Sequence, residues 1–186
     1  QKLASLFAPF VRQLYPWLEV EKGRALEDFT CGVRDKHAAE LPDVCLDCQP
    51  GLNVVNLEPM SYRTAHLDAN NKLFTGLFYM RVEGDDSEGG DLVLYKAKKN
   101  PLTFDTPTTI PEEDLEAVKT IRYRANTVLF FMNSPVSFHG VSVRGGTTIP
   151  RRLVNLIAGL YTLQSKGLFP SPPAPEIISN TRFTAP

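Results

Sequence analysis

The stretch "HLDANNKLFTGLFYM", residues 66–80, places a histidine and an aspartate two residues apart, just before an apolar and β-prone run. Side chains of a strand alternate between its two faces, so we expect His66 and Asp68 to share one face, roughly 6–7 Å apart. A single metal ion can bridge two ligands at that separation. The pair alone also fits a surface histidine in the turn before a strand. Other parts of the sequence must therefore show whether these residues bind a metal.

Length and charge narrow the class of protein. The chain has 186 residues and a net charge of −1, which suits one domain over residues 1–186 and gives no basic field for a polyanion. Nucleic acid is therefore not favoured as a partner. No apolar run approaches the ~18–20 residues of a membrane-spanning helix, so we expect no membrane partner and a cytoplasmic (intracellular) location.

Cysteine is sparse in this chain. Cys31, Cys45 and Cys48 are an odd number without the spacing of a disulfide framework. The sequence "CLDC" at residues 45–48 has the spacing of zinc ligands, but no second close pair accompanies it. We expect ordinary thiols, with a redox or zinc role as the alternative.

The first forty residues have a helical pattern. Apolar residues at i, i+3 and i+4 predict a helix that ends before Pro16, and a second helix is expected from about Glu27 to Leu41. The apolar positions of the first helix are Leu3, Leu6, Phe7, Phe10, Val11 and Leu14.

Further along the chain, β-branched and aromatic runs alternate with Gly, Pro, Asn and Asp clusters, which is typical of short strands. The predicted strands lie within residues 53–68, 72–82, 89–97, 121–132 and 151–163.

The remaining segments complete the predicted layout. Residues 82–90, "VEGDDSEGG", and residues 98–114 predict loops, which we expect to act as mobile lids. We expect a mostly helical part at 1–50, a jelly-roll core at 51–165 and a Pro-rich tail at 166–186. Helices followed by many short strands indicate a mainly β (α+β) fold, with a double-stranded β-helix (jelly roll, cupin-like) core and N-terminal supporting helices.

A second histidine and an arginine complete a constellation with His66 and Asp68. His139 ends a strand-like run, and two histidines with one aspartate form a facial triad that leaves three positions of Fe(II) open. Arg151 begins an apolar strand, where a guanidinium suits a carboxylate as a bidentate partner. His37 lies in a polar helical context and is expected at the surface.

Residues from about Asn53 to Tyr161 resemble the Fe(II)/2-oxoglutarate-dependent oxygenase superfamily, in particular its prolyl-4-hydroxylase-like branch. The family's HxD…H…R pattern matches the four residues of the constellation. The sequences "EGGDLVLY" at 88–95 and "YRANTVLFFMNSPVSFHGV" at 123–141 also resemble family segments. The matching catalytic residues are His66, Asp68, His139 and Arg151.

The resemblance implies a cosubstrate site as well. Tyr79 and Arg151 would bind the distal carboxylate of 2-oxoglutarate, and Thr75 and Leu77 would line the same pocket by alternation. Only one of two neighbouring arginines can face inward. We favour Arg151 over Arg152, a choice that turns Leu153 and Asn155 toward the pocket.

One position departs from the family pattern. The family usually has a tyrosine ten residues before the first histidine, where this chain has Asn56. In a regular strand Asn56 would lie on the face of His66 as a cosubstrate contact, and Tyr62 would fill part of the same space.

The resemblance also implies a reaction. His66, Asp68 and His139 would bind Fe(II), with 2-oxoglutarate and O₂ as cosubstrates, ascorbate as an accessory reductant, and succinate and CO₂ as co-products. Asp68 argues against the radical halogenases of this superfamily, which replace that carboxylate by a small residue, so hydroxylation or a related oxidation is expected. A peptide side chain, a small metabolite and a nucleobase all stay open as substrate.

Two other classes stay open. The triad also suits Zn(II) in a cupin-like enzyme that does not use 2-oxoglutarate, and the barrel could be a non-catalytic ligand-binding protein. Arg151 and Tyr79 favour the oxygenase, because the other two classes need no carboxylate anchor.

Overall fold

The computed structural model describes residues 2–34, 42–99, 110–160 and 167–169. Strands predominate over helices in these residues. In chain order the elements are α1 (Lys2–Leu14), α2 (Leu18–Lys22), the 3₁₀ turn η1 (Leu26–Asp28), β1 (Cys31–Val33), β2 (Val44–Asn53), β3 (Lys72–Tyr79), β4 (Leu92–Ala97), the 3₁₀ turn η2 (Glu112–Asp114), β5 (Leu115–Ile121), β6 (Thr127–Met132), β7 (His139–Val141) and β8 (Arg151–Gly159).

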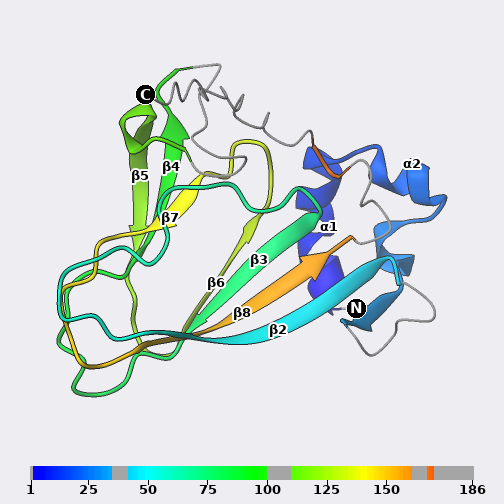
Figure 1. Cartoon of the computed structure of the whole chain (residues 1–186). Helices are drawn as coiled ribbons and strands as arrows, with labels where there is room; N and C mark the ends of the chain where they lie inside the picture. Colours follow the sequence, from blue (N-terminus) through cyan, green and yellow to red (C-terminus); the bar gives the residue numbers. More distant parts are fainter. Residues whose placement is uncertain (1, 35–41, 100–109, 161–166, 170–186) are drawn as a thin grey trace, which may run out of the picture.

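The strands form two sheets. The larger has the order β1-β2-β8-β3-β6 and the smaller has the order β5-β4-β7. Figure 1 shows β2, β8 and β3 side by side as long twisted strands, with β4, β5 and β7 grouped beyond them. This mainly β, two-sheet arrangement confirms the predicted jelly-roll fold class.

The register of β8 decides which of its side chains face the space between the sheets. β8 pairs antiparallel with β2 on one side and β3 on the other, so that Asn155 lies opposite both Gln49 and Leu77. Because side chains alternate, Arg151 shares the inner face with Asn155. Arg151 is 2% exposed, whereas Arg152 is exposed on the outer face.

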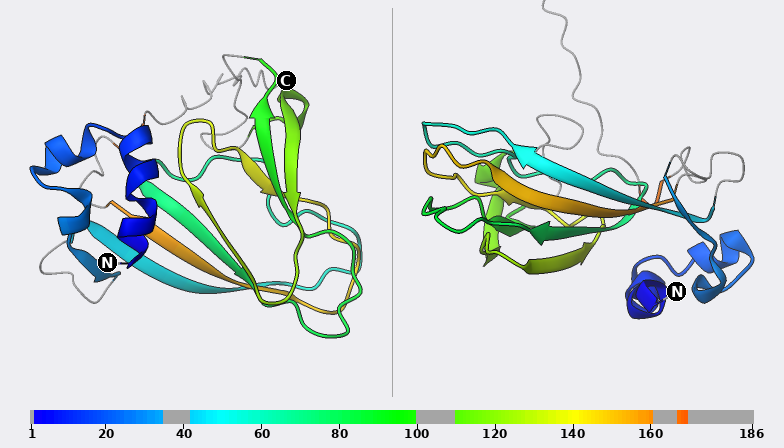
Figure 2. Two further views of the ribbon diagram at one scale, coloured as in Figure 1. Left: turned by 180° about the vertical axis from the view of Figure 1, so that it is seen from behind. Right: turned by 90° about the horizontal axis from the view of Figure 1, so that it is seen from below.

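The outer face of the larger sheet packs against the N-terminal helices (Figure 2, left). Phe7 of α1 stacks on Phe74 of β3 with ring centroids 4.7 Å apart. The buried members of this cluster are Ala8, Val11, Tyr15, Leu18, Leu26, Val44, Leu73, Phe74, Ala158, Leu160, Leu168 and Phe169.

The apolar stripe predicted for the first helix is only partly buried. Val11 is 2% exposed and Phe7 packs on the core, but Leu6 and Phe10 are 60% and 53% exposed. A helix that lies flat on a sheet contacts it along a narrow face, and this face includes the small residue Ala8. The apolar pattern of α1 is therefore wider than its contact with the sheet.

The second predicted helix, from about Glu27 to Leu41, is wrong in its first part. Residues 26–28 form a single 3₁₀ turn, and Cys31–Val33 forms β1, which pairs parallel with β2. Tertiary pairing with β2 outweighs the local helical pattern. Residues 35–41, which include His37, lie outside the described residues.

The long strand predicted over residues 53–68 is also wrong. Only Asn53 belongs to a strand, β2, and the segment after it crosses between the sheets through isolated bridges at Asn56, Met60 and His66. The strict alternation assumed there does not hold. The other four predicted strand segments contain β3, β4, β6 and β8.

Residues 82–90 form the predicted loop, which is anchored at two points and exposed at others, and its role as a mobile lid stays a prediction. The side chain of Asp85 is fully buried and forms an ion pair with Arg144. Gly89 has a φ of +75° and lies so close to the backbone of Val143 that any Cβ would clash with it. Most of the second predicted lid, residues 98–114, lies outside the described residues, as does most of the tail at 166–186. No helix among the described residues has both the length and the apolarity to cross a bilayer.

The packing of α1 yields a matched pair of variants. Phe7→Ala should lower the free energy of unfolding by roughly 2–4 kcal/mol, because it removes a ring stacked on Phe74 and leaves a cavity. Phe10→Ala, on the exposed side of the same helix, should change it by less than about 0.5 kcal/mol. Urea unfolding of both variants measures the difference, and equal losses would contradict this packing.

Candidate metal centre

The two histidines are brought together by the backbone. His66 and His139 form an isolated antiparallel bridge in which the N–H of His66 donates to the carbonyl of His139 at 2.8 Å, and the reverse bond is 3.1 Å long. Their ring centroids lie 4.3 Å apart. A segment without regular structure and the short strand β7 thus place two imidazoles side by side.

Asp68 completes a candidate metal site with these histidines. One ligand atom from each of His66, Asp68 and His139 lies within 4.8 Å of the others, and the group is 5–9% exposed. Among the described residues, no other group of three or more potential ligands is found. The zinc alternative for Cys31, Cys45 and Cys48 therefore has no support, and none of the three forms a disulfide.

The hydrogen bonds of the two imidazoles fix their tautomers. Nδ1 of His66 lies 2.8 Å from the carbonyl oxygen of Thr64, and Nδ1 of His139 lies 2.9 Å from that of Ser137. A carbonyl can only accept, so each Nδ1 carries the proton and each Nε2 keeps a free lone pair. Burial lowers the pKa of both histidines, that of His66 to about 4. Both rings are therefore neutral at pH 7, as metal ligation requires.

Both carboxylate oxygens of Asp68 are held by residues of β3. Lys72 Nζ donates to Oδ1 at 2.7 Å and Thr75 Oγ1 donates to Oδ2 at 2.6 Å. Burial alone would raise the pKa of Asp68, but the charge of Lys72 and these hydrogen bonds outweigh it and lower the pKa. Asp68 is therefore an ionised and oriented carboxylate.

A cavity of about 390 Å³ joins the triad to Arg151. Of the predicted site residues, it brings together the triad, Arg151, Thr75, Leu77 and Asn155. Tyr62 also lines it, as expected. The lining residues are Gln49, Gly51, Asn53, Tyr62, Arg63, His66, Asp68, Lys72, Thr75, Leu77, Leu92, Phe131, His139, Gly140, Val141, Arg151, Leu153, Asn155 and Ile157.

Arg151 has no carboxylate partner among the described residues. Its Nε donates to the carbonyl of Gly90 at 2.9 Å, and its Nη1 donates to Oδ1 of Asn53 at 3.2 Å. Burial lowers the pKa of Arg151, but a guanidinium starts so high that it stays charged. A buried and unpaired cation is costly unless an anion binds to it.

Two predicted cosubstrate contacts lie outside the lining of the cavity. Tyr79 is fully buried against Arg151, whose guanidinium carbon lies 5.0 Å from the centroid of its ring. Its hydroxyl has no hydrogen-bond partner among the described residues, and burial raises its pKa. Asn56 instead bridges to Thr147, because the chain leaves the sheet after Asn53. Asn56 is therefore not a cavity residue.

Sequence reasoning missed several polar residues of this region. Lys72 and Asn53 begin and end strands, and nothing in their local sequence distinguishes them from solvent-exposed positions. Arg144 is 1% exposed and Tyr123 is 1% exposed, yet Arg144 follows the distal histidine in a Gly-rich turn, and Tyr123 lies in a predicted strand where nothing marks it as part of the site.

Comparison with known proteins agrees with this geometry. The profile of the 2OG-Fe(II) oxygenase superfamily matches residues 52–157, and no curated protein matches the chain. The matched segment is more than half of the chain and includes the triad and Arg151. The narrower resemblance to the prolyl-4-hydroxylase-like branch stays a prediction. The chain belongs to the 2OG-Fe(II) oxygenase superfamily, whose members use Fe(II) and 2-oxoglutarate.

Proposed function

We propose that this protein is a hydroxylase in which His66, Asp68 and His139 bind Fe(II) and Arg151 binds the distal carboxylate of 2-oxoglutarate. The observation that carries the proposal is the burial of Arg151 at 2% exposure in the wall of the cavity that contains the triad, with no ion pair to any described residue. A charge in that position needs an anionic partner. A 2-oxo acid with a second carboxylate would supply it.

The donor set fits the ion. Two neutral imidazoles with free Nε2 lone pairs and one carboxylate are the facial ligand set of non-haem Fe(II) oxygenases. When bound, iron supplies the oxidative chemistry that couples decarboxylation of 2-oxoglutarate to oxidation of the substrate. The protein supplies orientation of the ligands and an enclosed cavity.

The surrounding residues have separate tasks in this proposal. Lys72 and Thr75 keep the carboxylate of Asp68 ionised and turned toward the histidines. Leu77 and Leu153 form an apolar wall on the way to Arg151, which excludes water and strengthens the charge pairing at its end. The buried hydroxyl of Tyr79 lies beside Arg151 and has no hydrogen-bond partner of normal geometry among the described residues, so we propose it as a second donor to the distal carboxylate after a small rotation of its ring.

The alternatives make different demands on the chain. A zinc-dependent cupin-like enzyme or a non-catalytic barrel has no use for a buried, unpaired Arg151, and this residue is what favours the oxygenase. The substrate is proposed only as a peptide side chain, a small metabolite or a nucleobase. Measuring succinate release across panels of peptides and metabolites would identify the class.

The first prediction concerns iron. The wild-type protein should bind one Fe(II) per chain and, with 2-oxoglutarate under anaerobic conditions, develop a weak visible charge-transfer band. Asp68→Ala should abolish the band, because the site loses its only charged ligand. The control Asp86→Ala removes an exposed carboxylate and should change neither the band nor the iron content. A persistent band in Asp68→Ala would refute the triad.

The second prediction concerns the orientation of Asp68. Thr75→Val keeps the shape of the side chain but removes the hydroxyl that donates to Oδ2. We expect iron affinity to fall about 10–100-fold, as is usual when a hydrogen bond to a metal ligand is lost. Thr75→Ser restores the hydroxyl and should bind iron nearly as the wild type does. Metal-competition titrations give the iron affinity of all three proteins. An unchanged affinity in Thr75→Val would show that Thr75 does not orient Asp68.

The third prediction concerns Arg151. Arg151→Ala should weaken 2-oxoglutarate about ten- to a hundred-fold, because a charge-assisted pair is lost where water is excluded. Arg151→Lys should recover only part of that loss, since an ammonium lacks the planar fork. Iron binding should survive in both variants. Titration of the charge-transfer band gives the affinities.

The neighbouring arginine is the matched control for this prediction. Arg152 is exposed on the opposite face of β8, so Arg152→Ala should cost almost no affinity for 2-oxoglutarate. If neither substitution weakens binding, the carboxylate anchor is wrong and the zinc or cupin-like alternative becomes the better explanation.

A further inference from the structure

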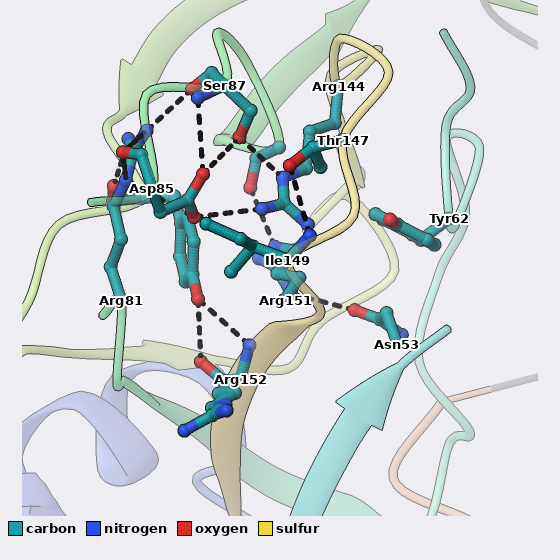
Figure 3. A network of polar contacts seen from close by, with 12 residues as sticks. Asn53, Tyr62, Arg81, Asp85, Ser87, Arg144, Thr147, Ile149, Arg151 and Arg152 are labelled. Carbon is teal, nitrogen blue, oxygen red and sulfur yellow. Dashed lines mark hydrogen bonds and ion pairs between the residues drawn. The ribbon is translucent and has the colours of Figure 1, made fainter. Parts of the chain in front are cut away.

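We propose that Arg144 and Tyr123 are positioning residues that hold the guanidinium plane of Arg151, so that the cavity selects a dicarboxylic 2-oxo acid over a monocarboxylic one. The inference rests on the proposed function of Arg151. Figure 3 shows Asp85, Ser87, Arg144 and Arg151 gathered around the start of β8. Arg144 does not line the cavity itself, so any effect on a ligand must act through Arg151.

The first structural link between Arg144 and Arg151 is the backbone carbonyl of Gly90. This carbonyl accepts the Nε–H of Arg151 at 2.9 Å and thereby fixes the edge of the guanidinium. Gly90 has a φ of +72°, and a Cβ there would meet Cδ of Arg144 at 3.2 Å and Cδ of Arg151 at 3.5 Å. The peptide of Gly90 therefore lies between the two arginine side chains.

Arg144 fixes the loop that presents this carbonyl. Its Nε donates to Oγ of Ser87 at 2.8 Å and its Nη2 donates to Oδ2 of Asp85 at 2.8 Å. Ser87 in turn donates its hydroxyl to Asp85 at 2.6 Å. From the other side, Arg81 donates to the backbone carbonyls of Asp85 and Ser87 at 2.7 and 2.6 Å. Hydrogen bonds from Arg144 and from Arg81 thus hold the loop on two sides, just before Gly90.

Tyr123 provides the second connection. Its ring centroid lies 4.8 Å from the guanidinium carbon of Arg151, 5.9 Å from that of Arg144 and 5.5 Å from that of Arg81. Its hydroxyl donates to the carbonyl of Arg152 at 3.2 Å and accepts the N–H of Arg152 at 2.8 Å. Tyr123 therefore contacts the guanidinium of Arg151 and also holds the backbone next to it.

The charges of this cluster favour an added anion. Three guanidiniums surround Tyr123, and two carboxylates accompany them. Asp85 forms ion pairs with Arg81 and Arg144, and Asp91 accepts the backbone N–H of Tyr123 at 2.7 Å. Nη1 of Arg144 is buried without a partner among the described residues. Like charges repel in a buried setting, so a carboxylate bound to Arg151 relieves repulsion that the cluster itself creates.

The test compares two ligands that share one chelating group. 2-Oxobutyrate keeps the 1-carboxylate and the keto oxygen of 2-oxoglutarate but lacks the distal carboxylate. The readout is the ratio of the two dissociation constants, measured with Fe(II) under anaerobic conditions by the charge-transfer band. A purely structural role would lower the melting temperature without moving this ratio.

The variants separate the two connections. In Asp85→Asn/Arg144→Gln, amides replace both charges, so that no buried carboxylate is left unpaired. Tyr123→Phe keeps the ring and removes the hydroxyl, whereas Tyr123→Leu removes both. The control Arg124→Gln removes an exposed arginine adjacent to Tyr123.

The double variant and Tyr123→Leu should each reduce the preference for 2-oxoglutarate about five- to thirty-fold, the usual size of an effect transmitted through a neighbouring residue. Tyr123→Phe should give a smaller reduction, and Arg124→Gln should give none. If the double variant does not fold, the two Tyr123 variants decide the question.

Two outcomes would overturn the inference, and they are distinguishable. If Arg151→Ala loses the preference while the Arg144 and Tyr123 variants keep it, the positioning role is wrong and the proposed function stands. If Arg151→Ala itself keeps the preference, the carboxylate anchor of the proposed function is wrong, and the positioning role falls with it.

Discussion

The reciprocal backbone bridge between His66 and His139 is the constraint on which the centre depends. It joins a segment without regular structure to the shortest of the strands in the smaller sheet, and it sets both imidazoles at one point between the sheets. Gly140, the next residue, lies so close to the backbone of Ala65 that a Cβ there would be crowded at 3.0 Å. The close approach of these two segments therefore brings the metal ligands together, and the absence of a side chain at Gly140 permits that approach.

The remaining polar groups divide the cavity into two ends. At one end the carbonyls of Thr64 and Ser137 and the side chains of Lys72 and Thr75 act on the three candidate ligands. At the other end, backbone and aromatic contacts surround Arg151. The apolar side chains between the ends belong to β3, β4, β6 and β8. Each end of the cavity contains residues from several segments, so the sequence of any one strand does not reveal which residues meet there.

The sequence predicted well those features that a local pattern encodes. The apolar runs that contain β3, β4, β6 and β8, and the motif residues His66, Asp68, His139 and Arg151, are evident without coordinates. β2 was missed because Pro50 and Gly51 interrupt it, although pairing with β8 forms there. β5 was missed because its middle is exposed and has charged residues. Asn56 was misplaced because an irregular crossing does not preserve alternation, and the cluster around Tyr123 exists only through tertiary contacts.

The central place of β8 in the larger sheet affects how the protein can open. β8 is hydrogen-bonded on both edges, to β2 and to β3, whereas β1 and β6 lie at the edges of the sheet. An edge strand can detach in a local fluctuation, but releasing β8 requires breaking two ladders at once. Arg151, which begins β8, is thus attached to a strand whose amide hydrogens we expect to exchange slowly. The end of the cavity that contains Arg151 should persist through partial opening and disappear together with the fold.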